Sequence, residues 1–179
     1  MSGDYGSERR STALQWMVPG LAGGMMFAML AMIVGIWTSA FWAPPQGIAQ
    51  AIGIGPNGHD FHIVPFILGL MGHMMNSVIL GAIFVAMARA TKMGPMMLVV
   101  AGTVWGLVVY GILYYLLLPD VFSLWASAGV QSFVSTVPTW TWVVAHLLFG
   151  MTLGGALAYG PFRLRTGQPH GARPQAALQ

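Results

Sequence analysis

Two histidines could carry chemistry in this sequence of 179 residues, because each lies inside a long apolar segment. His73 follows Pro65 by eight residues, and His146 follows Pro138 by the same interval. If each proline begins a helix, a rise of 1.5 Å per residue puts both imidazoles roughly 12 Å along it. A neutral imidazole there can ligate a copper ion, a haem iron or a chlorophyll magnesium, or join two helices by a hydrogen bond. Both interpretations stay open, and the hydrogen bond is favoured.

Small residues follow each histidine by four and eight positions, on the same helical face. Faces of this kind let two helix backbones approach closely, which places the histidines toward the interior of a helix bundle. Further small residues at intervals of four either pack the helices together or dock the chain against another subunit. The positions assigned to such contacts are Gly20, Gly24, Ser77, Gly81, Gly102, Gly106, Gly150 and Gly154.

Methionine offers a second possible chemistry, since the chain has 14 and thioethers combined with imidazole suit Cu(I). Methionine is also an adaptable filler of apolar cores, and packing is the favoured interpretation. The methionines concerned share a helical face or flank His73, and they are Met25, Met29, Met32, Met71, Met74 and Met75.

A third candidate is the group His59, Asp60 and His62, which could bind a divalent cation at the start of the second apolar segment. The favoured alternative is a solvated Asp60 that initiates a helix, with two histidines at the membrane interface.

Other chemistry is excluded by what the sequence lacks. The absence of cysteine excludes disulfides, thiolate-held clusters and covalently attached c-type haem. No Asp, Glu, Lys or Arg lies within the long apolar segments, which argues against a proton pump or a coupled transporter. No nucleotide-binding glycine loop, serine–histidine–acid arrangement or zinc-protease motif is present, so we expect no catalytic site.

The elements that position the histidines are four apolar segments, each longer than the roughly 18 residues that mark a spanning helix. The chain is 56% hydrophobic and 6% charged, as expected for a protein embedded in a lipid bilayer. We predict an all-α, four-helix transmembrane bundle over 16–160, preceded by a cytoplasmic segment 1–15 and followed by a disordered cytoplasmic tail 161–179. The predicted spans are 16–42, 61–88, 96–118 and 138–159.

Charge predicts the orientation of these spans. All Lys and Arg residues flank the ends of spans on one side, whereas the connections 43–60 and 119–137 contain no cation. The positive-inside rule places both termini in the cytoplasm. The membrane that we expect is a bacterial inner membrane. This distribution also explains the net charge of +3 without any nucleic-acid partner.

The two halves of the chain resemble each other. A shift of 73 residues aligns Val64-Pro65 with Val137-Pro138 and His73 with His146. The first and third spans align at a shift of 79, through Ala22-Gly23. The pattern predicts two tandem hairpins of the same orientation.

Short helices are predicted in both outer connections. One would include Ile48 to Ile52. The other would begin at Asp120 as its N-cap, run through Trp125 and lie flat in the interface.

The segment Ala145 to Gly154, with its fainter copy from Gly72 to Gly81, resembles small four-span bacterial inner-membrane proteins of unknown function. The resemblance implies a four-span fold but no activity. The function expected from the sequence is a non-catalytic accessory subunit of a larger bioenergetic membrane complex, with other membrane subunits as partners. The alternatives are a haem-, chlorophyll- or copper-binding protein that uses His73 and His146, and a small-solute channel.

Overall fold

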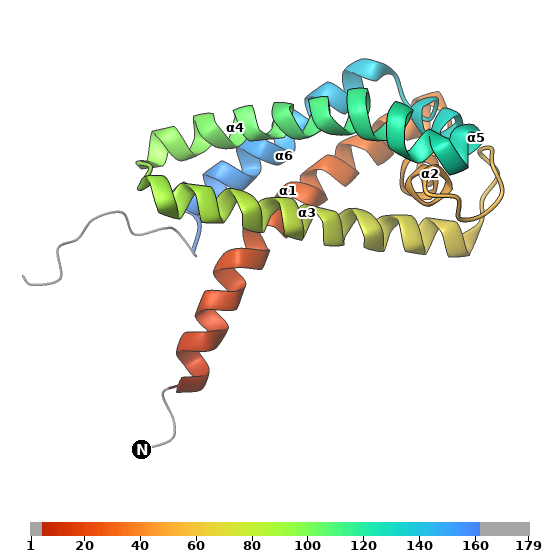
Figure 1. Ribbon diagram of the computed structural model, residues 1–179. Coiled ribbons are helices and arrows are strands. Elements are labelled where there is room, and N and C mark those ends of the chain that lie inside the picture. The colour runs from red at the N-terminus through yellow and green to blue at the C-terminus, as the bar shows by residue number, and fades with distance from the viewer. Residues whose placement is uncertain (1–4, 162–179) are drawn as a thin grey trace, which may run out of the picture.

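The computed structural model describes residues 5–161, and this part of the chain is helical, without strands (Figure 1). The predicted tail lies outside the described residues except for Pro161. In chain order the elements are α1 (Tyr5–Thr38), α2 (Ala43–Ala51), α3 (Ile63–Thr91), α4 (Pro95–Ile112), η1 (Leu113–Phe122), α5 (Ser123–Val134) and α6 (Thr139–Tyr159).

The prediction of four apolar helices is confirmed. Four helical stretches are long and apolar enough to cross a membrane, and their bounds are Ala13–Thr38, Ile63–Thr91, Pro95–Val134 and Thr139–Tyr159. The predicted and observed bounds agree closely for the second and fourth spans. They differ most at the end of the third.

The third span does not end before Pro119, as the sequence suggested. The chain continues through this proline as the π-helix η1 and then into α5. Proline has no N–H to donate and obstructs a regular α-helical turn, whereas the wider π turn moves the hydrogen bonds to a longer spacing. Asp120 does not cap α5, which has no side-chain cap, and the bend occurs instead at Ala126 with φ −138° and ψ 38°.

The short helix predicted near Ile48 is present as α2, but most of its residues are buried. It packs between α3 and α5 at one end of the molecule (Figure 1). Gly69 of α3 lies against the Pro45 carbonyl, and Gly129 of α5 lies against the Gln50 carbonyl. Because a Cβ at either glycine would overlap a backbone oxygen, α2 is fixed closely against both neighbours.

Two buried glutamines on α2 hold the loop 52–62. The Gln50 side-chain amide donates to the carbonyls of Pro56 and Gly58, at 2.7 and 2.9 Å. The Gln46 amide donates to the Asp60 carbonyl at 2.8 Å, and its oxygen accepts the His62 N–H at 2.8 Å. These bonds satisfy polar groups that burial would otherwise penalise, and they fix the loop over α2.

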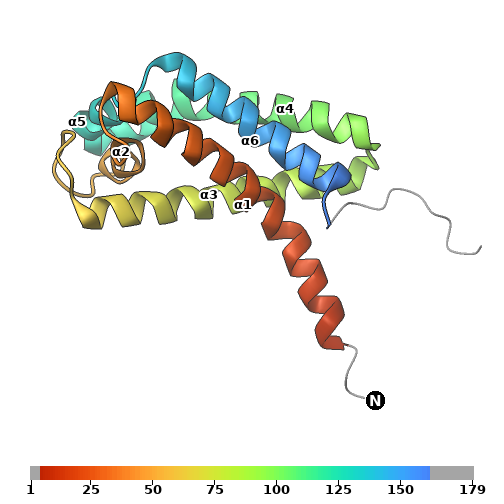
Figure 2. The same cartoon turned by 180° about the vertical axis from the view of Figure 1, so that it is seen from behind.

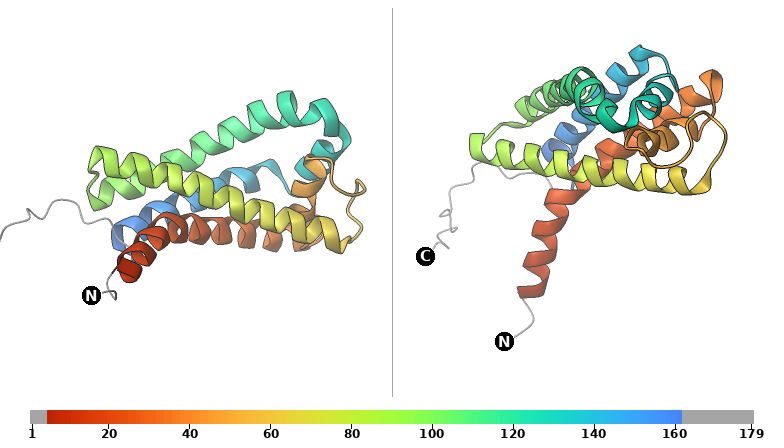
Figure 3. Two further views of the ribbon diagram at one scale, coloured as in Figure 1. Left: turned by 60° about the horizontal axis from the view of Figure 1, so that its bottom comes forward. Right: turned by 45° about the vertical axis from the view of Figure 1, so that its right-hand side comes forward.

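The long helices pack in the order α3, α1, α6, α4. Figure 2 shows α1 and α6 side by side, whereas α3 and α4 lie on the far side of this pair. A tight turn with Lys92 in the left-handed region, at φ 50°, joins α3 to α4. The two helices diverge from that turn and barely touch (Figure 3). The predicted four-helix bundle is therefore open along one side.

All eight positions assigned to close helix contacts lie at two helix pairs. Gly20 and Gly24 of α1 meet Ser77 and Gly81 of α3. In the other pair, Gly102 and Gly106 of α4 meet Gly150 and Gly154 of α6, and Gly106 also lies against the His146 carbonyl. These small residues therefore join helices within the chain.

We expect Gly106→Ala to destabilise the fold by about 1–3 kcal/mol, because the new Cβ overlaps the His146 carbonyl oxygen and the backbones must separate. The matched control is Gly111→Ala on the same helix, where an added Cβ meets no atom within 4 Å. Unfolding of the two variants in mixed micelles, followed by tryptophan fluorescence, measures the difference. Equal stability of the two variants would contradict the assigned α4–α6 contact.

Candidate functional site: a cavity between α3 and α4

A cavity of about 400 Å³ occupies the open side of the bundle, between α3 and the α4–η1 segment. Helices α1 and α6 contribute to its wall, and α2, α5 and Phe122 contribute at one end. The described residues of the lining are apolar except for four side chains, those of His73, Asn76, Ser77 and His146. Its remaining residues are Phe27, Ile48, Ala51, Ile52, Gly72, Met75, Leu80, Val109, Leu113, Leu117, Leu118, Phe122, Phe133 and Phe149.

His73 joins α3 to α1. Its Nε2 lies 2.9 Å from the Gly24 carbonyl oxygen. A carbonyl only accepts hydrogen bonds, so Nε2 carries the proton, and in the neutral ring Nδ1 holds the lone pair. The interhelical hydrogen bond favoured from the sequence is therefore present, and one nitrogen of the ring stays available as an acceptor or ligand.

His146 bonds within its own helix. Its Nδ1 lies 2.7 Å from the Trp142 carbonyl, so Nδ1 donates and Nε2 holds the lone pair in the neutral ring. The side chain is buried and packs against Tyr110, with ring centroids 5.4 Å apart. The interhelical hydrogen bond favoured from the sequence is therefore wrong for His146, and the two histidines share a cavity but have different structural roles.

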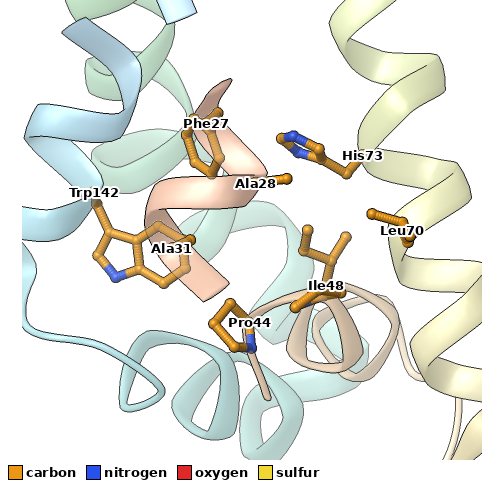
Figure 4. Close-up of a pocket in the computed structure, with 9 residues that line it drawn as sticks. Phe27, Ala28, Ala31, Pro44, Ile48, Leu70, His73 and Trp142 are labelled. Atoms are coloured by element: carbon orange, nitrogen blue, oxygen red, sulfur yellow. The ribbon is translucent and has the colours of Figure 1, made fainter. Parts of the chain in front are cut away.

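Phe27 of α1 contacts both imidazoles. Its ring centroid is 4.9 Å from that of His73 and 4.7 Å from that of His146. Figure 4 shows Phe27 and His73 facing each other from α1 and α3, with Trp142 nearby on α6. The small pocket that these residues help to line has a volume of about 10 Å³, which is room for about one water molecule. Sequence reasoning missed Phe27, since it belongs to no histidine or glycine pattern.

Asn76 is exposed to the cavity and makes no hydrogen bond with any residue in the described part of the chain. An unpaired carboxamide in an apolar environment is costly, by about 1–3 kcal/mol on mutational scales. Ser77, its neighbour, donates to the His73 carbonyl at 2.8 Å, and its oxygen can still accept. Asn76 is therefore the polar group of the cavity that most lacks a partner.

The other predicted ligands do not gather at this cavity. Met25 and Met29 are about half exposed on the outer surface of α1, and of the six methionines considered only Met75 lines the cavity. His59 faces Ser135 at 3.4 Å in the loop region. Within residues 13–161, no three His, Asp or Glu side chains form a possible metal site. Copper binding and a cation at His59, Asp60 and His62 stay predictions.

The lining residues also indicate how well the cavity would suit a macrocyclic cofactor such as haem or chlorophyll. The lone pairs of His73 Nδ1 and His146 Nε2 suit an iron or magnesium ligand. However, no Lys or Arg of the described part of the chain lines the cavity, so carboxylates such as those of haem would lack a cationic partner there. The donor set therefore fits a neutral ligand better than an anionic one.

No family model, curated protein or solved structure matches this chain.

We expect His73→Leu to cost about 1 kcal/mol more stability than His146→Leu. The His73 bond joins two helices and is lost when they separate, whereas the His146 bond lies within one helix and persists in separated helices. Unfolding titrations of both variants in the same mixed micelles provide the measurement. A larger loss for His146→Leu would refute this division of roles.

Proposed function

We propose that the protein binds a neutral, lipid-soluble molecule in the cavity between α3 and α4. The observation that carries this proposal is an apolar cavity that contains unpaired polar atoms. It lies on the open side of the helical assembly, where α3 and α4 barely touch. Pockets of 300–1,000 Å³ with apolar walls and a few polar groups are typical of small-molecule sites. Because the open side lies between two apolar helices, the ligand enters laterally from the bilayer.

A cavity-filling variant tests this proposal. Gly72 lines the cavity, and a Cβ there meets no atom within 4 Å, so Gly72→Phe should fill the space without disturbing the backbone. Gly155→Phe on α6 is the matched control, since Gly155 also has open space around it but does not line the cavity.

The protein is purified in mild detergent from its native membrane, and the bound molecules are extracted with organic solvent and identified by mass spectrometry. We expect a neutral apolar compound to accompany the wild type and Gly155→Phe, and to fall at least about tenfold in Gly72→Phe. Equal amounts in all three samples, or none in the wild type, would count against ligand binding at this cavity.

We further propose that the α3–α4 turn faces the cytoplasm of a bacterial cell, with both chain termini on the same side. Arg89 and Lys92 lie at this end, and Arg89 stacks over Trp16 at 4.5 Å. Asp60 and Asp120 lie beyond the opposite ends of α3 and α4, where the described loops hold no Lys or Arg. This charge asymmetry supports the inner-membrane orientation expected from the positive-inside rule.

The lack of cysteine makes this orientation easy to test. Asn57→Cys in the exposed loop should react with a membrane-impermeant maleimide in intact spheroplasts. Met93→Cys in the α3–α4 turn should react only after permeabilisation. The reverse pattern would show that the protein is inserted in the opposite orientation.

We also propose that the chain arose as two tandem hairpins. The α1–α3 and α4–α6 contacts are alike. Gly20 and Gly24 of α1 contact the small residues of α3 that lie C-terminal to His73. In the same way, Gly102 and Gly106 of α4 contact the small residues of α6 that lie C-terminal to His146. These contacts pair the first and third spans at a shift of 82 residues, in place of the 79 expected from Ala22-Gly23.

A role as an accessory subunit of a bioenergetic membrane complex is the second candidate. It is favoured by the small size of the described segments outside the spans. The glycine faces give it less support than expected, because they are occupied within the chain. Partners that co-purify in mild detergent would support this role. A solute channel has the least support, because Ile48, Ala51 and Phe133 contribute apolar surface at the α2–α5 end of the cavity.

A further inference from the structure

We infer that the ligand of this cavity offers a hydrogen-bond donor, a hydroxyl or N–H group on a neutral apolar body, to the imidazole lone pairs of His73 and His146. The inference rests on the proposed function and specifies the chemistry of the ligand. A phenol, a quinol or a long-chain alcohol belongs to this class, whereas a quinone, an ether or a fatty acid anion does not.

Three of the cavity's four polar side chains already donate their protons within the protein. His73 Nε2 donates to Gly24, His146 Nδ1 donates to Trp142, and the Ser77 hydroxyl donates to the His73 carbonyl. Each bond ends on a carbonyl, so the direction of donation is fixed. What each side chain can still offer a ligand is an acceptor: Nδ1 of His73, Nε2 of His146 and the oxygen of Ser77.

Among the described residues that line the cavity, Asn76 alone has a free donor, and its carboxamide carries an acceptor as well. The acceptors therefore outnumber the donors. A ligand with a donor satisfies them, whereas a ligand with acceptors alone leaves the imidazole lone pairs unpaired in an apolar space. Such unpaired polar atoms are the physical basis of strong discrimination between otherwise similar ligands.

The lack of charge on the described lining residues narrows the class of ligand further. Among the described residues, no Asp, Glu, Lys or Arg lines the cavity, so neither a cationic nor an anionic head group would find a counter-charge there. Transfer of an unpaired ion from water into apolar surroundings is far more costly than transfer of a hydroxyl. The ligand is therefore neutral in its bound form.

A matched pair of probes tests the inference on the full-length protein in detergent. The probes are 4-nonylphenol and 4-nonylanisole, which share one apolar body and differ in that the methyl ether lacks the O–H donor. Binding is measured by titration calorimetry in the same detergent. We expect the phenol to bind at least about tenfold more tightly, which corresponds to about 1.4 kcal/mol. Equal affinities, or tighter binding of the ether, would overturn the inference.

Two variants locate the acceptors. His146→Leu should reduce the preference for the phenol at least about threefold, because one lone pair is removed. Asn76→Leu removes a donor together with an acceptor, so the preference should fall less than in His146→Leu, and the variant should fold normally, since Asn76 bonds no other described residue. Met71→Leu, an exposed position on the same helix outside the cavity, controls for changes on the surface of α3. Loss of the preference in Asn76→Leu, with retention in His146→Leu, would overturn the assignment to the histidines.

The outcomes also separate this inference from the proposed function. If both probes bind equally and Gly72→Phe blocks both, the cavity binds apolar molecules but the donor inference is wrong. If neither probe binds the wild type, the proposed site itself fails.

Discussion

The close approach of helix backbones at glycine determines this structure. At the α4–α6 contact, Gly102 and Gly106 lie directly against the backbone of Gly150, and α1 meets α3 in the same manner at Gly20 and Ser77. A bilayer provides no hydrophobic drive for such association, because lipid tails are as apolar as leucine. Dispersion between closely packed backbones and a few interhelical hydrogen bonds must supply it instead, and only small residues permit that distance.

These two tight pairs set the rest of the architecture. They are joined through α1 and α6, where Gly23 lies against the Phe149 carbonyl and Phe27 lies against His146. With α1 and α6 at the centre, α3 and α4 are left without a mutual contact along most of their length. The cavity is thus a direct result of which helices carry the glycine faces. It needs no separate element to hold it open.

The same helix contacts determine which hydrogen-bonding atoms the polar side chains present to the cavity. The interhelical bond from His73 to Gly24 requires the α1–α3 approach, and it fixes which ring nitrogen keeps its lone pair. At one end, α2 and α5 cover the cavity. The buried side chains of Gln46 and Gln50 on α2 donate hydrogen bonds to loop carbonyls, so that α2 is buried without unpaired amide groups. Packing and hydrogen bonding therefore act together to place acceptors in an apolar, uncharged site.

The sequence alone determined four helices that are long and apolar enough to cross a membrane, the placement of both histidines within two of them and the positions of the glycine contacts, since hydropathy and four-residue spacing are local properties. It did not predict the π-helix through Pro119, the burial of α2 or the contact of Phe27 with both imidazoles. The open side between α3 and α4 was also decided only by the tertiary structure. The physical reason is that a glycine face shows that a helix packs closely, but the identity of its partner depends on all the helices competing in three dimensions.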